Sequence, residues 1–456
     1  IQGPGTASLG KLSLAETRRL PSEVLPTARH LVVATQYPSY DDLYRYGFVH
    51  ARVRAYARAG VVAEILRIST DPRVVYREFE GIDVTQADAA HFEQCLAGGH
   101  YRSILVHIIN QRIWNVLRNH LDRVRVVIWA HGAEIQPWWR RAMNQTTDAL
   151  RDQARRNSDA RMAMWRDIFT LHHPNLRVVF VSHKQAGEAL SDLNLSAAEV
   201  DGIEVISNFI DGDLFRYQEK DPALRHRVLS IRPFASPVYA NDLTVAAIVR
   251  LSREPFFDQM QFRIIGDGVL FDDIVAPLRD FPNVQVERAF LTQREIAALH
   301  RDYGVFLVPS RMDSQGVSRD EAMASGLVPI TNRVAAIPEF VDADCAFLAE
   351  PEDAAGLADA LRSLHEDPAL FAQMSVAAAE RVRKQSGLVQ TIARELALFV
   401  GNPAALPGPH RDERLVDAEA RSTRLALYGD VNLNIMDGSA IWAASLAEVL
   451  AGIPDV

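Results

Sequence analysis

The sequence has few cysteines and no long apolar segment. Its two cysteines, Cys95 and Cys345, stand far apart among 456 residues, which argues against a disulfide framework and indicates a reducing compartment. No window offers about 18 uninterrupted apolar residues, so no transmembrane helix is predicted. Residues 1–27 lack a basic stretch followed by an apolar one. We therefore predict a partly disordered leader and a cytoplasmic protein.

The sequence also lacks an excess of basic residues and the short motifs of several enzyme classes. A net charge of −9 at pH 7 argues against a nucleic-acid partner held through its phosphates. Metal-ligand spacings of His and Cys, a G-x-S-x-G nucleophile elbow and a G-x-x-x-x-G-K-[ST] phosphate loop are all absent. The acidic pair Asp211 and Asp213 falls in a predicted domain junction. We therefore predict neither a metal site nor a cofactor.

Short β-branched runs alternate with longer helical stretches from Arg29 onward, a pattern typical of parallel α/β sheets. The chain is too long for one core, so we predict two Rossmann-like domains, residues 28–218 and residues 219–401. The predicted strands of the first domain are residues 30–38, 62–68, 103–109, 124–132 and 177–183. Those of the second are residues 227–233, 261–268, 283–290, 305–310 and 327–331. Residues 402–456 follow as a Pro-rich linker and a strand–turn–helix tail.

The most informative segment is VFLVPSRMDSQGVSRDEAMASGLVPITNRVAAIPEFV, residues 305–341. It predicts a buried strand, a polar turn at residues 313–316, a short helix at 317–325 and a second buried strand. A helix that begins after a glycine turn points free N–H groups and its positive dipole end at whatever lies in front of it. Glu321 on this helix adds an acceptor for sugar hydroxyls. The segment therefore predicts a nucleotide-sugar site.

This segment resembles the donor-binding signature of retaining glycosyltransferases with the GT-B fold, in particular those of family 4. The positions that match are Pro309, Ser310, Gly316, Glu321, Ala322, Met323, Ala324, Gly326 and Pro329. The first acid of the paired-glutamate motif is Asp313 here. The resemblance implies an α/β protein of GT-B architecture, with an acceptor-side and a donor-binding domain and a cleft between them. It also implies metal-independent transfer of a sugar from a nucleotide-diphosphate sugar to a saccharide or lipid-linked saccharide acceptor, in surface polysaccharide biosynthesis.

The resemblance implies three catalytic residues and a donor loop. Glu321 would accept hydrogen bonds from the ribose hydroxyls, and His131 would lie at the lip of the cleft near the sugar carbons. Asp313 would face the transferred sugar. The N–H groups of the loop would face the sugar and the phosphates, and the loop residues are Ser314, Gln315, Gly316 and Val317.

The resemblance also implies donor-binding residues in other segments. Gly47 precedes the first helix, Gly266 ends a strand in the pattern I-x-G-x-G, and Phe290 is a candidate contact of the nucleotide base. Arg232 would bind the diphosphate. Relatives carry a lysine as a second cation, and the chain has no lysine at the corresponding place, residues 237–239. The candidates to replace it are Arg311, Arg319 and Arg333.

Several alternatives remain open at this point. The chain could be a catalytically degenerate GT-B module that serves as a binding or scaffold domain, or an epimerase of the same fold that needs no acceptor. Residues 424–451 resemble the start of a second transferase module in a tandem protein, or they form a terminal strand and helix of this fold. Peripheral contact with the inner membrane face is also left open.

Overall fold

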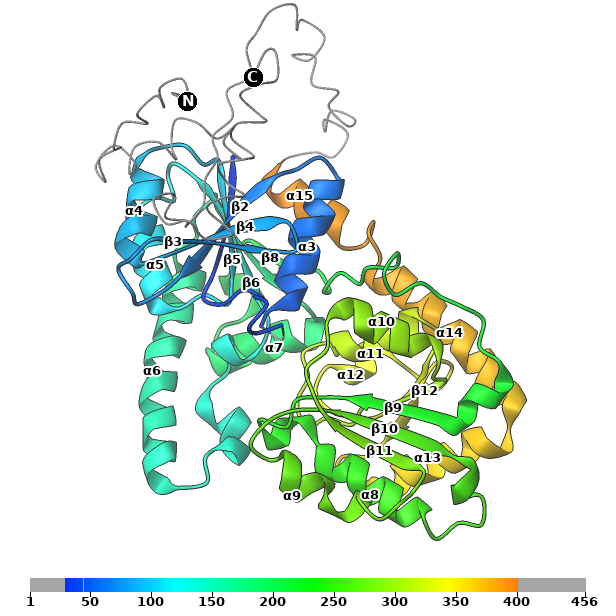
Figure 1. The fold of residues 1–456 in the computed structure, drawn as a ribbon. Helices are drawn as coiled ribbons and strands as arrows, with labels where there is room; N and C mark the ends of the chain where they lie inside the picture. The colour runs from blue at the N-terminus through cyan, green and yellow to red at the C-terminus, as the bar shows by residue number, and fades with distance from the viewer. Residues whose placement is uncertain (1–28, 44, 401–456) are drawn as a thin grey trace, which may run out of the picture. The chain divides into compact units, whose positions relative to one another are not determined.

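The computed structural model of the protein describes residues 29–43 and 45–400, and Figure 1 shows how their helices and strands are arranged. These residues form two sheets, each with helices on both faces. The predicted leader at residues 1–27 and the predicted linker and tail at 402–456 lie outside the described residues. The predicted class, α/β with two Rossmann-like sheets, is confirmed.

The first sheet has eight strands in the order β3-β4-β2-β1-β5-β6-β7-β8. All neighbouring pairs are parallel except β3 and β4. Its strands are β1 His30–Ala34, β2 Ala63–Ile68, β3 Val75–Phe79, β4 Ile82–Ala87, β5 Ser103–His107, β6 Arg125–Ala130, β7 Leu176–Phe180 and β8 Ile203–Val205. Its helices are α3 Gly47–Arg58, α4 Ala89–Ala97, α5 Gln111–Leu117, α6 Asp148–Thr170 and α7 His183–Asp192. The central strands are rich in Val, Ile and Leu because both of their faces are buried.

The second sheet has six strands in the order β11-β10-β9-β12-β13-β14, all parallel. They are β9 Arg227–Ile231, β10 Gln261–Gly266, β11 Val284–Arg288, β12 Val305–Leu307, β13 Val328–Asn332 and β14 Phe347–Ala349. The helices are α8 Asn241–Leu251, α9 Phe271–Val275, α10 Gln293–Arg301, α11 Val317–Ala324, α12 Ile337–Phe340, α13 Ala354–Glu366 and α14 Pro368–Ser386. Strand β12 and helix α11 therefore lie where the segment 305–341 predicted a strand and a helix.

The sequence pattern does not predict the hairpin of β3 and β4. Its strands carry charged side chains, and the middle of β3 is exposed, so the periodic apolar signal of a buried strand is weak there. The turn is made by Glu80 and Gly81, both with positive φ, which is the backbone conformation of a tight hairpin turn.

The last described helix, α15 Ile392–Phe399, packs on the first sheet rather than on the second. Ile392, Leu396 and Phe399 join the core cluster that contains Trp129 of β6. The predicted second domain, residues 219–401, therefore includes a helix that belongs by packing to the first. An amphipathic helix buries its apolar stripe on whichever surface it reaches, and the sequence of the helix alone does not identify that surface.

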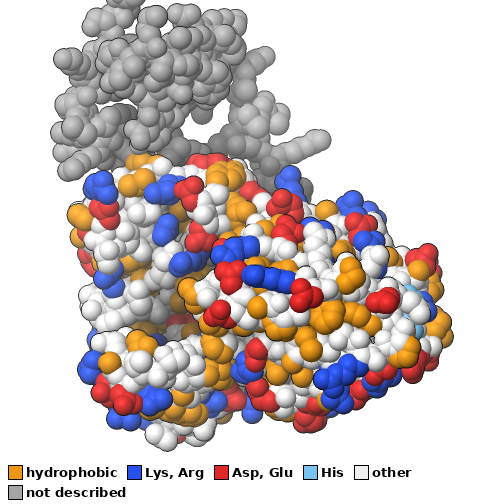
Figure 2. Space-filling model, turned by 60° about the horizontal axis from the view of Figure 1, so that its bottom comes forward, with side chains coloured by type: hydrophobic (Ala, Val, Ile, Leu, Met, Phe, Trp, Pro, Cys, Tyr) orange, Lys and Arg blue, Asp and Glu red, His pale blue; other side chains and the backbone are white. Residues whose placement is uncertain are grey.

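The described surface carries both signs of charge. On the face in Figure 2, basic and acidic side chains are interspersed, with no single large patch of one sign. Within the described residues, no helix combines the length and the apolar composition that crossing a bilayer requires.

Candidate functional site

Helix α11 begins directly after a left-handed turn. Gly316 has φ 101° and ψ 57°, a conformation that side chains other than glycine rarely adopt. No side chain caps the helix, and its first internal bond runs from the N–H of Asp320 to the carbonyl of Gly316. The N–H groups of the first turn are therefore available to an anion, with the positive end of the helix dipole behind them.

Arg232 lies at this helix N-terminus. It follows β9, is only 7% exposed, and donates from Nη1 to Ser318 Oγ in the first turn of α11 at 3.2 Å. Its guanidinium lies 5.1 Å from the ring centroid of Tyr239. The structure therefore places the predicted diphosphate cation beside the uncapped N–H groups.

The loop before α11 is held partly by its own side chains. Asp313 Oδ1 accepts from the N–H of Gln315 at 3.2 Å, so this N–H already has a partner. The buried Gln315 side chain accepts from the N–H and Nδ2 of Asn208 at 2.6 and 2.9 Å and donates to Asp320 at 2.9 Å. Gln315 therefore fastens the loop to the segment after β8. Its main-chain N–H and its side-chain amide are therefore already paired within the chain, and its role as a donor contact stays a prediction.

The loop after β6 packs closely against the donor loop. A Cβ added at Gly132 would lie 2.9 Å from Ser314 Oγ. Next to it, His131 Nε2 is 3.0 Å from Nδ1 of His107, and its ring centroid is 4.4 Å from that of Phe48. Burial lowers the pKa of His131 well below its ordinary value, and the nearby charge of Arg52 acts in the same direction. His131 is therefore neutral at pH 7.

Glu321 lies in a cleft to which both sheets contribute residues. The cleft has an empty volume of about 670 Å³, part of it open to solvent. Gly47 and Phe48 line it from the start of α3, and Val317 and Glu321 line it from α11. Burial raises the pKa of Glu321 to about 8, although a hydrogen bond with Gln293 lowers it. Three predicted residues, Gly47, Val317 and Glu321, are thus brought together.

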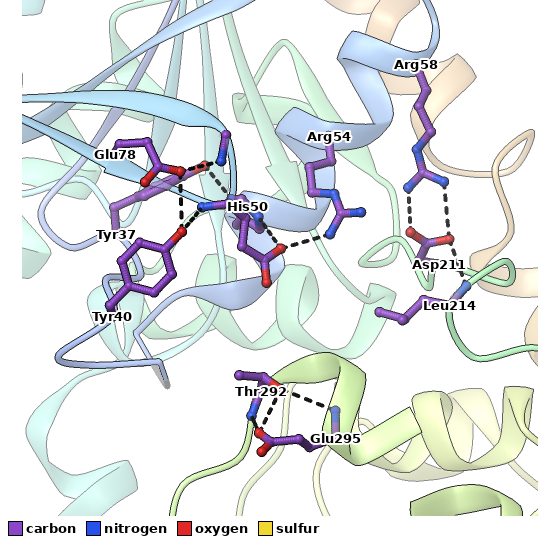
Figure 3. A network of polar contacts seen from close by, with 12 residues as sticks. Tyr37, Tyr40, His50, Arg54, Arg58, Glu78, Asp211, Leu214, Thr292 and Glu295 are labelled. Carbon is purple, nitrogen blue, oxygen red and sulfur yellow. Dashed lines mark hydrogen bonds and ion pairs between the residues drawn. The ribbon is translucent and has the colours of Figure 1, made fainter. Parts of the chain in front are cut away.

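A polar network forms part of the wall that the first sheet contributes to this cleft (Figure 3). Tyr37 Oη is 2.9 Å from His50 Nδ1, and His50 Nε2 is 3.2 Å from Glu80 Oε2. Arg54 donates to the same carboxylate oxygen at 3.0 Å. Burial lowers the pKa of His50, and Glu80 opposes that shift. These residues were not predicted, because Glu80 comes from the unpredicted hairpin and only the fold brings it beside α3.

Neither Gly266 nor Phe290 is among the residues that line the cleft. A Cβ at Gly266 would lie 1.9 Å from the carbonyl oxygen of Arg232 and 2.8 Å from the ring of Phe234. The direction in which a Cβ would point from Gly266 is therefore filled by the chain itself. Phe290 is 42% exposed and is not among the residues that line the cleft. It lies just past the end of β11, an edge strand of the second sheet.

The three arginines considered as replacements for the second cation are all engaged elsewhere. Each lies against a carboxylate: Arg311 with Asp242 and Glu352, Arg319 with Asp320, and Arg333 with Glu350. An arginine already paired would have to exchange one anion for another to bind a diphosphate. None of the three is an obvious second cation.

The acidic pair of the domain junction is also engaged. Asp211 forms an ion pair with Arg58 (Figure 3). Asp211 also accepts from the N–H of Asp213 at 3.1 Å, and Asp213 lies 3.3 Å from the same arginine. Within residues 29–43 and 45–400, no three His, Cys, Asp or Glu side chains are grouped to hold a metal ion.

The raised pKa of Glu321 predicts a pH-dependent stability. Between its ordinary value of 4.5 and its folded value of about 8, the unfolded chain has released this proton and the folded chain has kept it. The stability that this group contributes is complete below about pH 4.5 and is lost as the pH rises to about 8, by up to about 5 kcal/mol. Glu321→Gln should remove this loss, measured by urea unfolding of both proteins at about pH 5 and about pH 8. The same change with pH in wild type and variant would contradict the assignment.

Comparison with known proteins agrees with this geometry. Residues 225–367 match the family model described as glycosyl transferases group 1. The chain is 27% identical over 191 residues to the MMP alpha-(1->4)-mannosyltransferase of Mycolicibacterium hassiacum. That alignment covers 41% of this chain and 45% of the relative, so it spans less than half of the relative's length.

Solved structures resemble the described fold more completely. Sucrose-phosphate synthase from Thermosynechococcus elongatus superposes with a TM-score of 0.62 at 15% identity, over 81% of this chain and 98% of that one. HepE of Anabaena, in complex with UDP and glucose, gives a TM-score of 0.58 at 14% identity, over 81% and 98%. At such identities the likeness shows the fold. The described residues therefore have the GT-B fold, and residues 225–367 are similar to the domain described as glycosyl transferases group 1.

Proposed function

We propose that the protein is a retaining, metal-independent glycosyltransferase of the family 4 type. It would move a sugar from a nucleotide-diphosphate sugar to a saccharide or lipid-linked saccharide acceptor. The observation that carries this proposal is the uncapped N-terminus of α11 beside Arg232, with Glu321 of the same helix in the cleft. Two relatives add support, since HepE was solved with UDP and glucose and the M. hassiacum protein is named a mannosyltransferase.

The proposed reaction needs no protein nucleophile. The bond between the sugar C1 and the β-phosphate oxygen breaks, and a bond between C1 and the acceptor oxygen forms on the same face. The departing phosphate oxygen takes the proton of the acceptor hydroxyl. Arg232 and the N–H groups at the start of α11 would stabilise the charge that grows on the diphosphate.

The remaining site residues have positioning roles in this proposal. Glu321 would hold the ribose hydroxyls, and Asp313 would shape the donor loop next to the sugar, since its carboxylate already bonds within that loop. His131 is neutral, so it would contact the sugar without placing a cation beside a carbon that becomes electron-poor. Gly47 would let the start of α3 approach the donor.

A thermal-shift panel of UDP, GDP, TDP and CMP sugars tests donor binding. A ligand that binds only the folded state raises the melting temperature by mass action, so one nucleotide class should stabilise the protein selectively. No stabilisation by any member at millimolar concentration would contradict the proposal. The class that binds is then tested for turnover with saccharide and lipid-linked acceptors.

The same experiments separate the proposed transferase from its alternatives. Selective binding without release of nucleoside diphosphate in the presence of any acceptor would favour a scaffold module. A changed sugar nucleotide formed from donor alone would favour an epimerase. Transfer to an acceptor with retained anomeric configuration is the outcome that we expect.

A further inference from the structure

The donor loop faces a short helix of the first domain across the site. This helix, η2 Trp138–Asn144, packs against η5 Pro237–Tyr239 of the second domain. Ser236 Oγ lies 2.7 Å from Asn144 Oδ1 at this contact. The backbone of η2 departs from helical geometry at Arg141, with φ −124° and ψ 28°. Arg141 is therefore the residue at which the short helix kinks.

The side chain of Arg141 extends toward the donor loop. Its Nε donates to Gln136 Oε1 at 2.8 Å, which fixes the base of the guanidinium. Its Nη2 lies 3.7 Å from the point that a Cβ at Gly132 would occupy, and Ser314 Oγ lies 2.9 Å from the same point. The guanidinium of Arg141 and the side chain of Ser314 in the donor loop therefore both lie next to Gly132.

Arg141 and Arg232 share a neighbour. The guanidinium of Arg232 lies 5.1 Å from the ring centroid of Tyr239, and Tyr239 is also close enough to Arg141 for its charge to act on it. Burial lowers the pKa of Arg141, while Glu134, Tyr239 and Asp313 oppose that shift. Two arginines from different domains thus lie near one aromatic side chain, Tyr239.

Arg141, like Arg232, forms no ion pair among the described residues, whereas Arg311, Arg319 and Arg333 each do. Within the described part of the chain its hydrogen bond is to an amide oxygen, and its terminal nitrogens have no carboxylate partner. A partly buried cation that contacts no carboxylate directly is incompletely compensated, and an anionic ligand would relieve that cost. A diphosphate carries at least two negative charges, and Arg232 supplies one positive charge.

We propose that Arg141 binds the diphosphate of the donor as a second cation, opposite Arg232. This assignment rests on the proposed function, because it supposes that a nucleoside diphosphate occupies the N-terminus of α11. Since Arg141 belongs to the first domain and Arg232 to the second, a diphosphate held by both links the two domains. No lysine in the second domain is then required.

The test measures the affinity of the full chain for UDP and GDP by calorimetry. Arg141→Met and Arg141→Gln should each weaken binding of the favoured diphosphate about 10- to 100-fold, the usual worth of a charge-assisted contact. The loss should be smaller for the corresponding monophosphate, and Arg141→Lys should restore part of it. Arg151→Gln is the matched control, because it removes the same charge from an exposed residue of α6 and should leave the affinity unchanged.

The outcomes distinguish this inference from the proposed function. Wild-type affinity in either folded Arg141 variant overturns the role of Arg141 and leaves the proposed function standing. Binding of neither UDP nor GDP nor any panel member by the wild type overturns both. If the variants do not fold, phenylglyoxal labelling of the wild type replaces them, with peptide mass spectrometry as the readout. Protection of Arg141 by the bound diphosphate supports the inference, and equal labelling with and without it contradicts the inference.

Discussion

Replacing Glu321 with alanine is expected to weaken binding of the favoured nucleoside diphosphate about 100-fold. Glu321 is 8% exposed and lines the cleft, so truncation would leave ribose hydroxyls without an acceptor at a buried position. Unpaired polar groups of this kind cost several kcal/mol when they are desolvated. Calorimetric titration of wild type and variant measures the loss directly.

Two further variants show whether the loss comes from the carboxylate at this position. Glu321→Gln keeps the shape and one acceptor oxygen, so its affinity should lie between those of wild type and Glu321→Ala. Asp313→Ala should lower turnover more than affinity, because the Asp313 carboxylate is partly committed to the loop N–H of Gln315. Equal affinity of wild type and Glu321→Ala would show that the ribose binds elsewhere.

Replacing Glu395 with alanine is expected to lower the free energy of unfolding by about 3–5 kcal/mol, the usual cost of removing one partner from a buried ion pair. Glu395 on α15 is fully buried and accepts from Arg52 Nε at 2.9 Å and from Trp129 Nε1 at 3.2 Å. It also accepts from the hydroxyl of Tyr56 at 2.5 Å. Without it, the buried Arg52 would keep its charge with no counter-charge beside it. Urea unfolding of the full chain measures the loss.

An exposed glutamate is the control for this measurement. Glu380 on α14 lies 3.5 Å from Lys384 at the surface, so Glu380→Ala should change the stability by less than about 0.5 kcal/mol. The pair Arg52→Leu with Glu395→Leu should recover much of the loss, because it removes both charges together. A loss below about 1 kcal/mol for Glu395→Ala would mean that α15 contributes little to the first domain.

Local sequence patterns predict those strands whose apolar composition follows from burial on both faces of the sheet. The central strands β1, β5, β6 and β7 are continuous apolar runs, and such runs indicate buried parallel strands wherever they occur. The hairpin at Glu80 carries no such run. The packing of α15 joins Arg52 to Glu395 across 343 positions, a contact that no local pattern encodes.

The residues of the candidate site also divide into those that local motifs predict and those whose contacts arise only in the folded chain. Glu321, Val317 and Arg232 were predicted from motifs that lie at strand ends, and the parallel sheet brings strand ends to one edge. Gln315 and Gly266 occupy the predicted segments, but their contacts are to the chain itself. Glycines and amides suit tight packing as well as ligand binding, and their sequence does not distinguish the two uses.

Residues from the opposite domain were the hardest to predict. Arg141 stands in an irregular, charge-rich stretch with no motif, and only the contact between η2 and η5 brings it to the donor loop. The wall formed by His50 and Glu80 depends in the same way on the hairpin meeting α3. Both were missed because their importance arises from tertiary contacts.

A crystal structure of the protein soaked with the nucleotide sugar that stabilises it most would decide where the donor lies. We expect the diphosphate at the uncapped start of α11, between Arg232 and Arg141, with the ribose hydroxyls hydrogen-bonded to Glu321. A ligand bound away from α11, or a Glu321 carboxylate without contact to the ribose, would contradict this assignment.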